Sequence, residues 1–310
     1  MSNWFFIALI APVLWSIVNH IDKYMLSKYL KERGVGALLI FSALASVIIL
    51  PFLFFFYRSQ IFNISNMDLV ILIFVGFLSA LAFYFYLEGM NEEEASVVIP
   101  LFQLVPVFGY FLGYLILDES LNTAQIFSSL LVISGIIILA VEIDIDNKIK
   151  IKGRVLGLIT ASSFLFALHD TLFKKVAITE SFMTSVFWQY VSLTVFGILI
   201  FIFVKKFRDD FLSMFHHMGK SLLSLNIISE LLYIAGNLTN NFATLLAPVA
   251  VVLVVSSYQP LFVFIGGIFL TIFWPEVSME KISTQHLLHK IISIVIIIIG
   301  SYFLYSSSHY

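Results

Sequence analysis

Residues 294–299 read Ile-Val-Ile-Ile-Ile-Ile, inside a longer apolar stretch that runs on to Ser301. A strand of a transmembrane barrel would alternate apolar and polar residues with a period of two, and this run does not alternate. Ten stretches of low charge are long enough to cross about 30 Å of hydrocarbon as helices. They cover residues 3–21, 36–57, 69–88, 95–117, 124–141, 154–173, 182–204, 222–243, 249–274 and 287–305. The sequence therefore predicts an all-α integral membrane protein with ten transmembrane helices.

The composition excludes several classes of protein. The 310 residues are 60% hydrophobic and 12% charged, whereas soluble domains are roughly 45–50% apolar and about 25% charged. A net charge of −2 argues against a nucleic-acid-binding protein, which needs a basic excess. The absence of cysteine excludes disulfide scaffolds, thiolate zinc sites and iron–sulfur clusters.

No enzyme signature is present in the sequence. His-Glu-x-x-His, Gly-x-Ser-x-Gly and the phosphate-binding loop are all missing. We therefore expect no enzymatic activity, no metal and no cofactor. A membrane-embedded enzyme, a receptor and an assembly scaffold remain as alternative classes.

An internal repeat links the two halves of the chain. The segment that ends at Pro106 is matched by the one that ends at Pro260, and Gly113 is matched by Gly267, each at a shift of 154 residues. Further matched residues follow in the same order: an acid (Glu119, Glu276), a glutamine (Gln125, Gln285) and a glycine in an Ile-rich stretch (Gly135, Gly300). The sequence predicts two five-helix units, 1–146 and 147–310, of opposite membrane orientation because five is odd. Chance similarity between apolar stretches is the alternative.

The two ordered series resemble the EamA repeat of the drug/metabolite transporter superfamily. The resemblance implies a 5+5 inverted repeat whose central cavity is lined by the first, third and fourth helices of each half. It also implies alternating-access transport of small metabolites, commonly amino acids or related amphiphiles. The chain departs from the family pattern at Phe273-Trp274-Pro275-Glu276, which replaces the shorter approach seen at Leu117-Asp118-Glu119.

The eighth predicted span carries a stripe of polar residues. Its members recur every three or four residues, which places them on one face of a helix: Asn226, Glu230, Tyr233, Asn237, Asn240, Asn241 and Thr244. Such a stripe cannot face lipid, since a charge at the membrane centre costs about 2.5–3.5 kcal/mol on insertion scales. It lines either a cavity, which we favour, or a polar seam between helices.

The first and sixth spans carry polar residues at matched positions. Asn19 corresponds to His169, and Asp170 follows His169 directly. These three residues are candidates for the substrate site. In the alternative interpretation, Asp170 lies near the membrane end and pairs with Lys174, at the i,i+4 spacing that suits a helical ion pair.

The fourth and ninth spans each hold a proline. Pro106 and Pro260 free carbonyl groups one turn earlier and are predicted to kink their helices. Bent helices at equivalent places in two repeats point to a substrate site. Further candidate residues on these spans are Gln103, Tyr110, Ser257 and Tyr258, while Trp188 and Gln189 on the seventh span are additional cavity candidates.

The membrane orientation is left open by two conflicting indications. All of the 17 Lys and Arg residues except Arg58, Lys174 and Lys175 fall on the side opposite the two chain ends. The positive-inside rule therefore places both ends outside the cytoplasm, whereas the family resemblance implies ends inside.

The candidate residues together suggest the kind of solute. Carboxylates (Glu230, Asp170), amides and aromatic rings suit a positively charged amine through ion pairing and cation–π contact. We expect a multi-pass secondary transporter in the lipid bilayer of the cell membrane. Its substrate would be an amino acid, a polyamine or a quaternary amine, and a proton is a candidate coupling ion. A flippase for lipid carriers or other amphiphiles is the alternative.

Overall fold

The computed structural model describes residues 3–29, 34–92, 101–140, 153–217, 220–273 and 284–307. Within these ranges every regular element is helical, so the all-α prediction is confirmed there. The helices of the first half are α1 (Trp4–Tyr29), α2 (Gly34–Ala45), the 3₁₀ turn η1 (Ser46–Ile48), α3 (Leu50–Ile61), α4 (Asn66–Glu92), α6 (Leu104–Leu117) and α7 (Thr123–Ala140). Those of the second half are α8 (Gly153–Ala177), α9 (Phe182–Phe203), α10 (Lys205–His217), α11 (Lys220–Leu246), α12 (Val249–Ser256), α13 (Gln259–Phe273) and α14 (Thr284–Ser307).

Several helices are long and apolar enough to cross a membrane. Five spans of the described chain meet that test, and a sixth is added if the α2–α3 pair, bent by 49°, counts as one. The protein is therefore a multi-pass membrane protein, while the total of ten spans stays a prediction. The test does not include α11, which is 27 residues long and carries the polar stripe that lowers its hydropathy.

One helix differs from the sequence prediction. Helix α10 covers residues that we expected in a loop between two spans, and its sequence starts with two lysines. Its apolar side chains pack on α2, where a Cβ added at Gly36 would lie 2.8 Å from the Cβ of Phe207. The alternation of charged residues with Phe207, Phe211 and Met214 is helical in period, and burial of these three side chains stabilises the helix.

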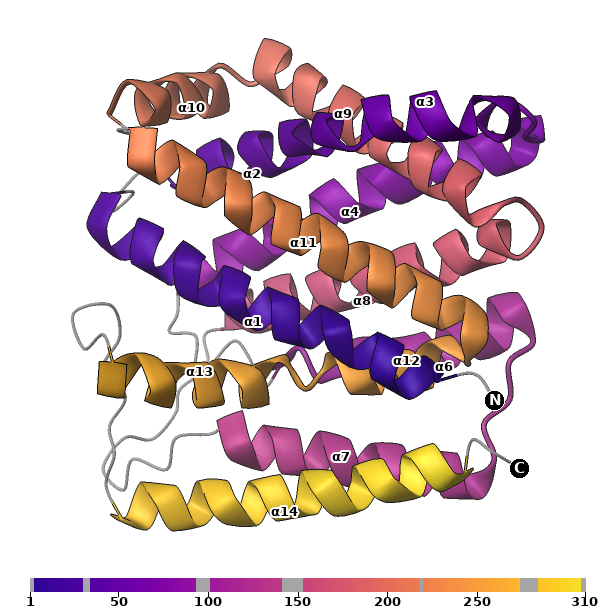
Figure 1. Ribbon diagram of the computed structural model, residues 1–310, viewed down its shortest axis with the longest axis vertical. Helices are drawn as coiled ribbons and strands as arrows, with labels where there is room; N and C mark the ends of the chain where they lie inside the picture. Colours follow the sequence, from indigo (N-terminus) through magenta and orange to yellow (C-terminus); the bar gives the residue numbers. More distant parts are fainter. Residues whose placement is uncertain are drawn as a thin grey trace.

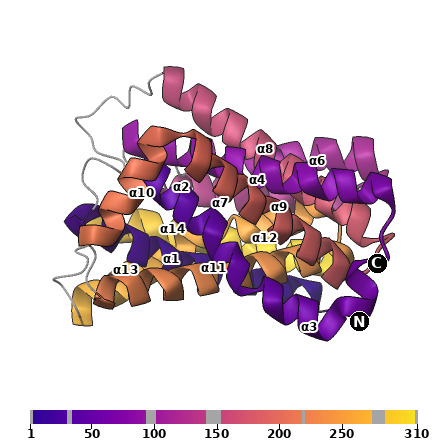
Figure 2. The same cartoon turned by 90° about the horizontal axis from the view of Figure 1, so that it is seen from above.

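The helices lie side by side in layers (Figure 1). Helices α2, α3 and α9 form one edge, α7 and α14 form the opposite edge, and α1, α4, α8 and α11 lie between them. Helix α11 packs along α1, α4 packs along α8, and α7 pairs with α14. Both chain ends lie on the same side of the molecule in both views (Figure 2). We call this the terminal side and its opposite the far side.

The helix contacts follow the proposed repeat. If each helix is exchanged for its counterpart in the other half, the α1–α11 pair becomes α8–α4, and the α6–α8 pair becomes α13–α1; all four contacts are present. The α7–α14 contact is exchanged with itself. These pairings are those expected of two units related by a two-fold axis, and the repeat itself stays a prediction. The predicted boundary between residues 146 and 147 lies outside the described residues.

The two proline-containing spans are broken in the same way. A break precedes Pro106 at Gln103, whose backbone has φ −66° and ψ −6°. The matching break precedes Pro260 at Ser257, with φ −67° and ψ −1°. In both cases the helix is interrupted three positions before the proline. Proline has no backbone N–H and cannot donate a hydrogen bond back along the helix.

Close helix contacts are made at glycines of both halves. A Cβ added at Gly135 of α7 would lie 2.8 Å from Ile297 of α14, and one at Gly300 of α14 would lie 2.8 Å from Val132 of α7. The contact is reciprocal. Outside the core, large side chains such as Phe55, at 79% exposure, face outward, as expected of a surface solvated by lipid.

Candidate functional site

The polar stripe of α11 points into the protein. Asn226, Glu230, Asn240 and Asn241 are each less than one tenth exposed, whereas Leu231 is 44% exposed on the other side of the helix. The burial of these four side chains is what we expect of a face that avoids lipid. The stripe is in contact with helices of both halves, because α11 lies against α1, α2, α8 and α12.

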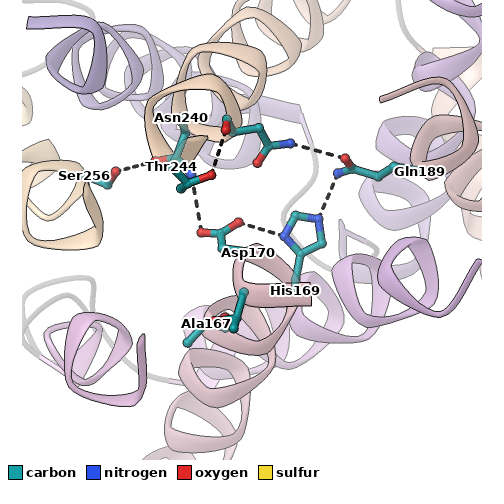
Figure 3. A network of polar contacts seen from close by, with 9 residues as sticks. Ala167, His169, Asp170, Gln189, Asn240, Thr244 and Ser256 are labelled. Atoms are coloured by element: carbon teal, nitrogen blue, oxygen red, sulfur yellow. Dashed lines mark hydrogen bonds and ion pairs between the residues drawn. The ribbon is translucent and has the colours of Figure 1, made fainter. Parts of the chain in front are cut away.

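The terminal half of the stripe belongs to a buried hydrogen-bond network (Figure 3). Asn240 Nδ2 of α11 donates to Asp170 Oδ2 of α8 at 3.3 Å, and His169 Nδ1 lies 2.8 Å from Asp170 Oδ1. On the other side of the imidazole, Gln189 Nε2 of α9 lies 2.8 Å from His169 Nε2. Asn241 Nδ2 donates to Gln189 Oε1 at 3.2 Å and closes the network on α11.

The network continues to the broken ninth span. Ser256 Oγ, at the end of α12, donates to Asn240 Oδ1 at 2.6 Å. Six side chains from α8, α9, α11 and α12 are therefore connected without interruption. Of the predicted site residues, this arrangement brings together His169, Asp170 and Asn241.

The proposed pairing of Asp170 with Lys174 is not formed. The ammonium group of Lys174 instead binds the carboxylate of Glu119 and donates to the carbonyl of Ala247 at 2.8 Å. The other oxygen of Glu119 accepts from the backbone N–H of Val249 at 2.8 Å, at the start of α12. This ion pair is buried, with side-chain exposures of 10% and 15%, and it joins the two halves at the terminal side.

The far half of the stripe is surrounded by aromatic rings. The ring centroid of Tyr233 lies 6.5 Å from that of Trp15 on α1 and 6.4 Å from that of Phe83 on α4. The series continues from Phe83 through Tyr86 to Phe102, at 6.0 and 5.3 Å. These rings come from α1, α4, α11 and the segment before α6, so a cluster of aromatic rings joins the two halves.

Glu230 lies one turn of α11 before Tyr233. Its carboxylate accepts a hydrogen bond from the hydroxyl of Ser42 on α2, and the residue is 7% exposed. It lies between the cluster of aromatic rings and the contact of α11 with α2. Asn237, one turn beyond Tyr233, is half-buried on the same face.

The other predicted site residues lie in different surroundings. Gln103 is 4% exposed, and its Oε1 has no hydrogen-bond partner among the described residues. Asn19 and Tyr110 are half-buried on α1 and α6. Ser257 donates back to Leu253 of its own segment at 2.9 Å. The hydroxyl of Tyr258 contacts Ser301 of α14 in the apolar core, so this side chain points away from the network.

A second ion pair lies on the far side. Arg154, at the start of α8, contacts Glu92 at 2.7 Å and Glu88 at 3.8 Å, both at the end of α4. The arginine side chain is 69% exposed. This pair also joins the halves, but in solvent.

Sequence reasoning missed Ser42, Ser256 and the partner of Lys174. Serine is common in membrane helices, so neither serine stood out. Glu119 was noted only as a repeat marker. Its 55-residue separation from Lys174 could not be inferred from helical spacing.

One comparison with known proteins matches part of the chain to a family. Residues 2–141 match the EamA-like transporter family, in agreement with the resemblance seen in the first of the two predicted repeats. No curated protein matches the chain. A solved structure titled only "Crystal structure of protein" is similar, with a TM-score of 0.69 and 13% identity over 100% of this chain and 98% of that one. At that identity the similarity shows the fold alone.

Proposed function

We propose that this chain, which carries an EamA-like transporter repeat in residues 2–141, is a secondary transporter of a small amine-bearing solute. The solute would be an amino acid, a polyamine or a quaternary amine, and it would cross the cell membrane by alternating access. The observation that carries the proposal is Glu230, a buried carboxylate beside a cluster of aromatic rings from both halves.

The chemistry of this region fits an organic cation. A buried carboxylate within a membrane protein attracts positive charge, and a solute ammonium group carries that charge. Tyr233, Trp15 and Phe83 present π faces that attract cations within about 6 Å. The aromatic side chains also suit the apolar part of an amphiphilic solute.

Alternating access requires contacts between the halves that can open on either side. The Glu119–Lys174 pair joins the halves on the terminal side, and the Arg154–Glu92 pair joins them on the far side. The helix breaks at Gln103 and Ser257 are the places where we expect the two spans to bend during transport. Broken helices at equivalent places in both repeats favour a transport site near the membrane midplane.

Transport in proteoliposomes tests the proposal. Purified protein is reconstituted, loaded with unlabelled choline, putrescine or lysine, and assayed for counterflow of the same radiolabelled compound. We expect counterflow for at least one of these probes and its loss in Glu230→Gln. Turnover of a compound without vesicles, or counterflow unaffected by Glu230→Gln, would contradict the proposal.

A cysteine scan tests the water-accessible cavity. The chain has no native cysteine, so single cysteines at positions 230, 233, 237 and 241 can be labelled without background. We expect reactivity at positions 233 and 237 above that of cysteines at the packed positions 243 and 244. Uniform protection along the face would favour a buried seam.

A further inference from the structure

The geometry points to the His169–Asp170 pair as the binding site for a coupling proton, separate from the solute carboxylate Glu230. The inference rests on the proposed transport function and adds the coupling ion and its location. It assigns a role to Gln189 and Asn241 as the groups that transmit proton binding to α9 and α11.

Asp170 is a buried acidic side chain with one basic neighbour among the described residues. The residue is 8% exposed, and both of its oxygens accept hydrogen bonds, as expected of an ionised carboxylate. Among the described residues, His169 is the one basic side chain within 4.0 Å of it, and Lys174 is bound to Glu119. A buried charge without a countercharge is costly, and one bound proton would neutralise the pair.

The placement of the two amides favours one arrangement of the hydrogen bonds around His169. Asn241 donates to Gln189 Oε1, so the amide nitrogen of Gln189 is the group facing His169 Nε2. An amide nitrogen can only donate, and His169 Nε2 must therefore accept. The imidazole proton is then on Nδ1 and is donated to Asp170. In this arrangement the imidazole donates to Asp170 and accepts from Gln189.

A proton added to this arrangement cannot be accommodated without movement. On His169 Nε2 it would place two donors face to face across 2.8 Å. Gln189 would have to reverse its amide, which would turn its nitrogen toward the amide nitrogen of Asn241 and force that group to turn as well. On Asp170 Oδ2 it would oppose the donor from Asn240. Proton binding at either residue therefore alters the contacts of α8 with α9 or α11.

The neighbouring helices offer few competing groups. Helix α12 has no titratable side chain, and α9 has Tyr190 alone. The titratable groups on the remaining helices packed against α8 are Asp68, Tyr84, Tyr86, Glu88 and Glu92 on α4, Tyr110 and Tyr114 on α6, and Glu230 and Tyr233 on the described part of α11. Of the described residues, only His169 among titratable groups is hydrogen-bonded to Asp170.

The proton site and the solute site lie on the same face of α11. Glu230 and Asn241 are eleven positions apart in the sequence, roughly 16 Å along the axis at about 1.5 Å per residue. A proton and a cationic solute therefore do not compete for one carboxylate. Their coupling would pass through a change in the contacts of α11, which both sites share.

A distance measurement tests proton binding without any solute. Ser120→Cys and Thr179→Cys lie at exposed positions of different halves beside the Glu119–Lys174 pair. Both are spin-labelled, and the distance distribution is recorded in nanodiscs at about pH 8 and pH 5. We expect the ratio of two distance populations to change by about tenfold in the Cys-pair parent. Asp170→Asn and His169→Gln should each abolish that change, while Glu230→Gln should retain it.

A local readout follows the imidazole itself. In protein labelled with ¹⁵N-histidine, the signal absent from His169→Gln identifies His169, and we expect the Nδ1–H form at about pH 8. A Nε2–H form would overturn the inference. So would a pH-independent parent, or a pH response lost in Glu230→Gln and kept in Asp170→Asn. Because neither measurement uses a solute, failure of the transport proposal would appear separately as absent counterflow.

Discussion

Helices α4 and α11 hold equivalent places in the two halves and have the same length, 27 residues. Yet they differ in what they bury. Helix α4 buries small and apolar residues, including Val75, Gly76, Ala80 and Ala82, whereas α11 buries Asn226, Glu230, Asn240 and Asn241. The difference teaches that two helices of equal length in similar packing positions can serve different purposes, one for close packing and the other for a polar network.

The polar network on α11 depends on the close packing of α4. Gly76 of α4 lets α9 approach closely, because an added Cβ would lie 2.5 Å from the Cβ of Ser192 and 2.9 Å from the carbonyl oxygen of Gln189. The same segment of α9 presents the Gln189 side chain to His169 and Asn241. The packing role of α4 thus positions a member of the network on α11.

The largest expected effect separates the acids of the two helices. Glu230→Gln on α11 should weaken binding of a cationic solute by about 30-fold or more, because removing one partner of a buried charge pair costs roughly 2–5 kcal/mol. Glu88→Gln on α4 is the control and should change affinity by less than about threefold, because Glu88 binds Arg154 at the far side. Scintillation proximity binding of the active probe measures both. Equal losses would remove the distinction between the helices.

A smaller effect is expected from the packing glycine. Gly76→Ala should lower the free energy of unfolding by about 1–3 kcal/mol, as for other overpacked sites. Its control is Gly157→Ala on α8, where an added Cβ meets nothing within 4 Å; that change should be neutral or stabilising by up to about 1 kcal/mol. Unfolding of the purified protein in mixed micelles gives both values, and a neutral Gly76→Ala would mean that α9 is not held by this contact.

The network on α11 gives the next comparison. Asn241→Ala leaves Gln189 Oε1 buried without its donor, which should cost about 1–2 kcal/mol in unfolding free energy. The matched change on α4 is Asn91→Ala, at an exposed position near the helix end, with an expected effect within about 0.5 kcal/mol. A stable Asn241→Ala protein would show that the amide is not needed for packing.

The smallest effect concerns the far-side ion pair. Arg154→Ala should cost less than about 1 kcal/mol, because the pair is largely in solvent. Glu119→Gln at the terminal side is its counterpart, since it would leave the Lys174 ammonium buried without a countercharge. The loss of melting temperature in Arg154→Ala relative to the parent should shrink at high salt, because salt already screens the exposed pair in the parent. The loss in Glu119→Gln should change little with salt. A similar salt response in both would contradict the assigned burial.

Much of the fold could be predicted from hydropathy because each apolar stretch reports its own length. The stripe on α11 was also predictable, since polar residues at intervals of three and four share one helical face. The amphipathic helix α10 was not, because its short and charged sequence resembles a loop between spans.

The partners of the site residues could not be predicted in the same way. Local spacing suggested Asp170 with Lys174, but Lys174 binds Glu119 across the two halves. Tyr258 was a candidate for the substrate site as an aromatic residue alongside Ser257 on the ninth span, and its hydroxyl contacts Ser301 in the core. In both cases the answer depends on which helix lies opposite, and that information is absent from a single helix.

The reciprocal contact between α7 and α14 has a consequence for substitutions at its two glycines. Gly135 accommodates a side chain near Gly300, and Gly300 accommodates one near Gly135, so the two helices use the same patch toward each other. A self-complementary patch of this kind is what joins identical subunits in a two-fold dimer. Because the two glycines belong to one chain, a substitution at Gly135 or at Gly300 alters one side of the contact and leaves the other side intact.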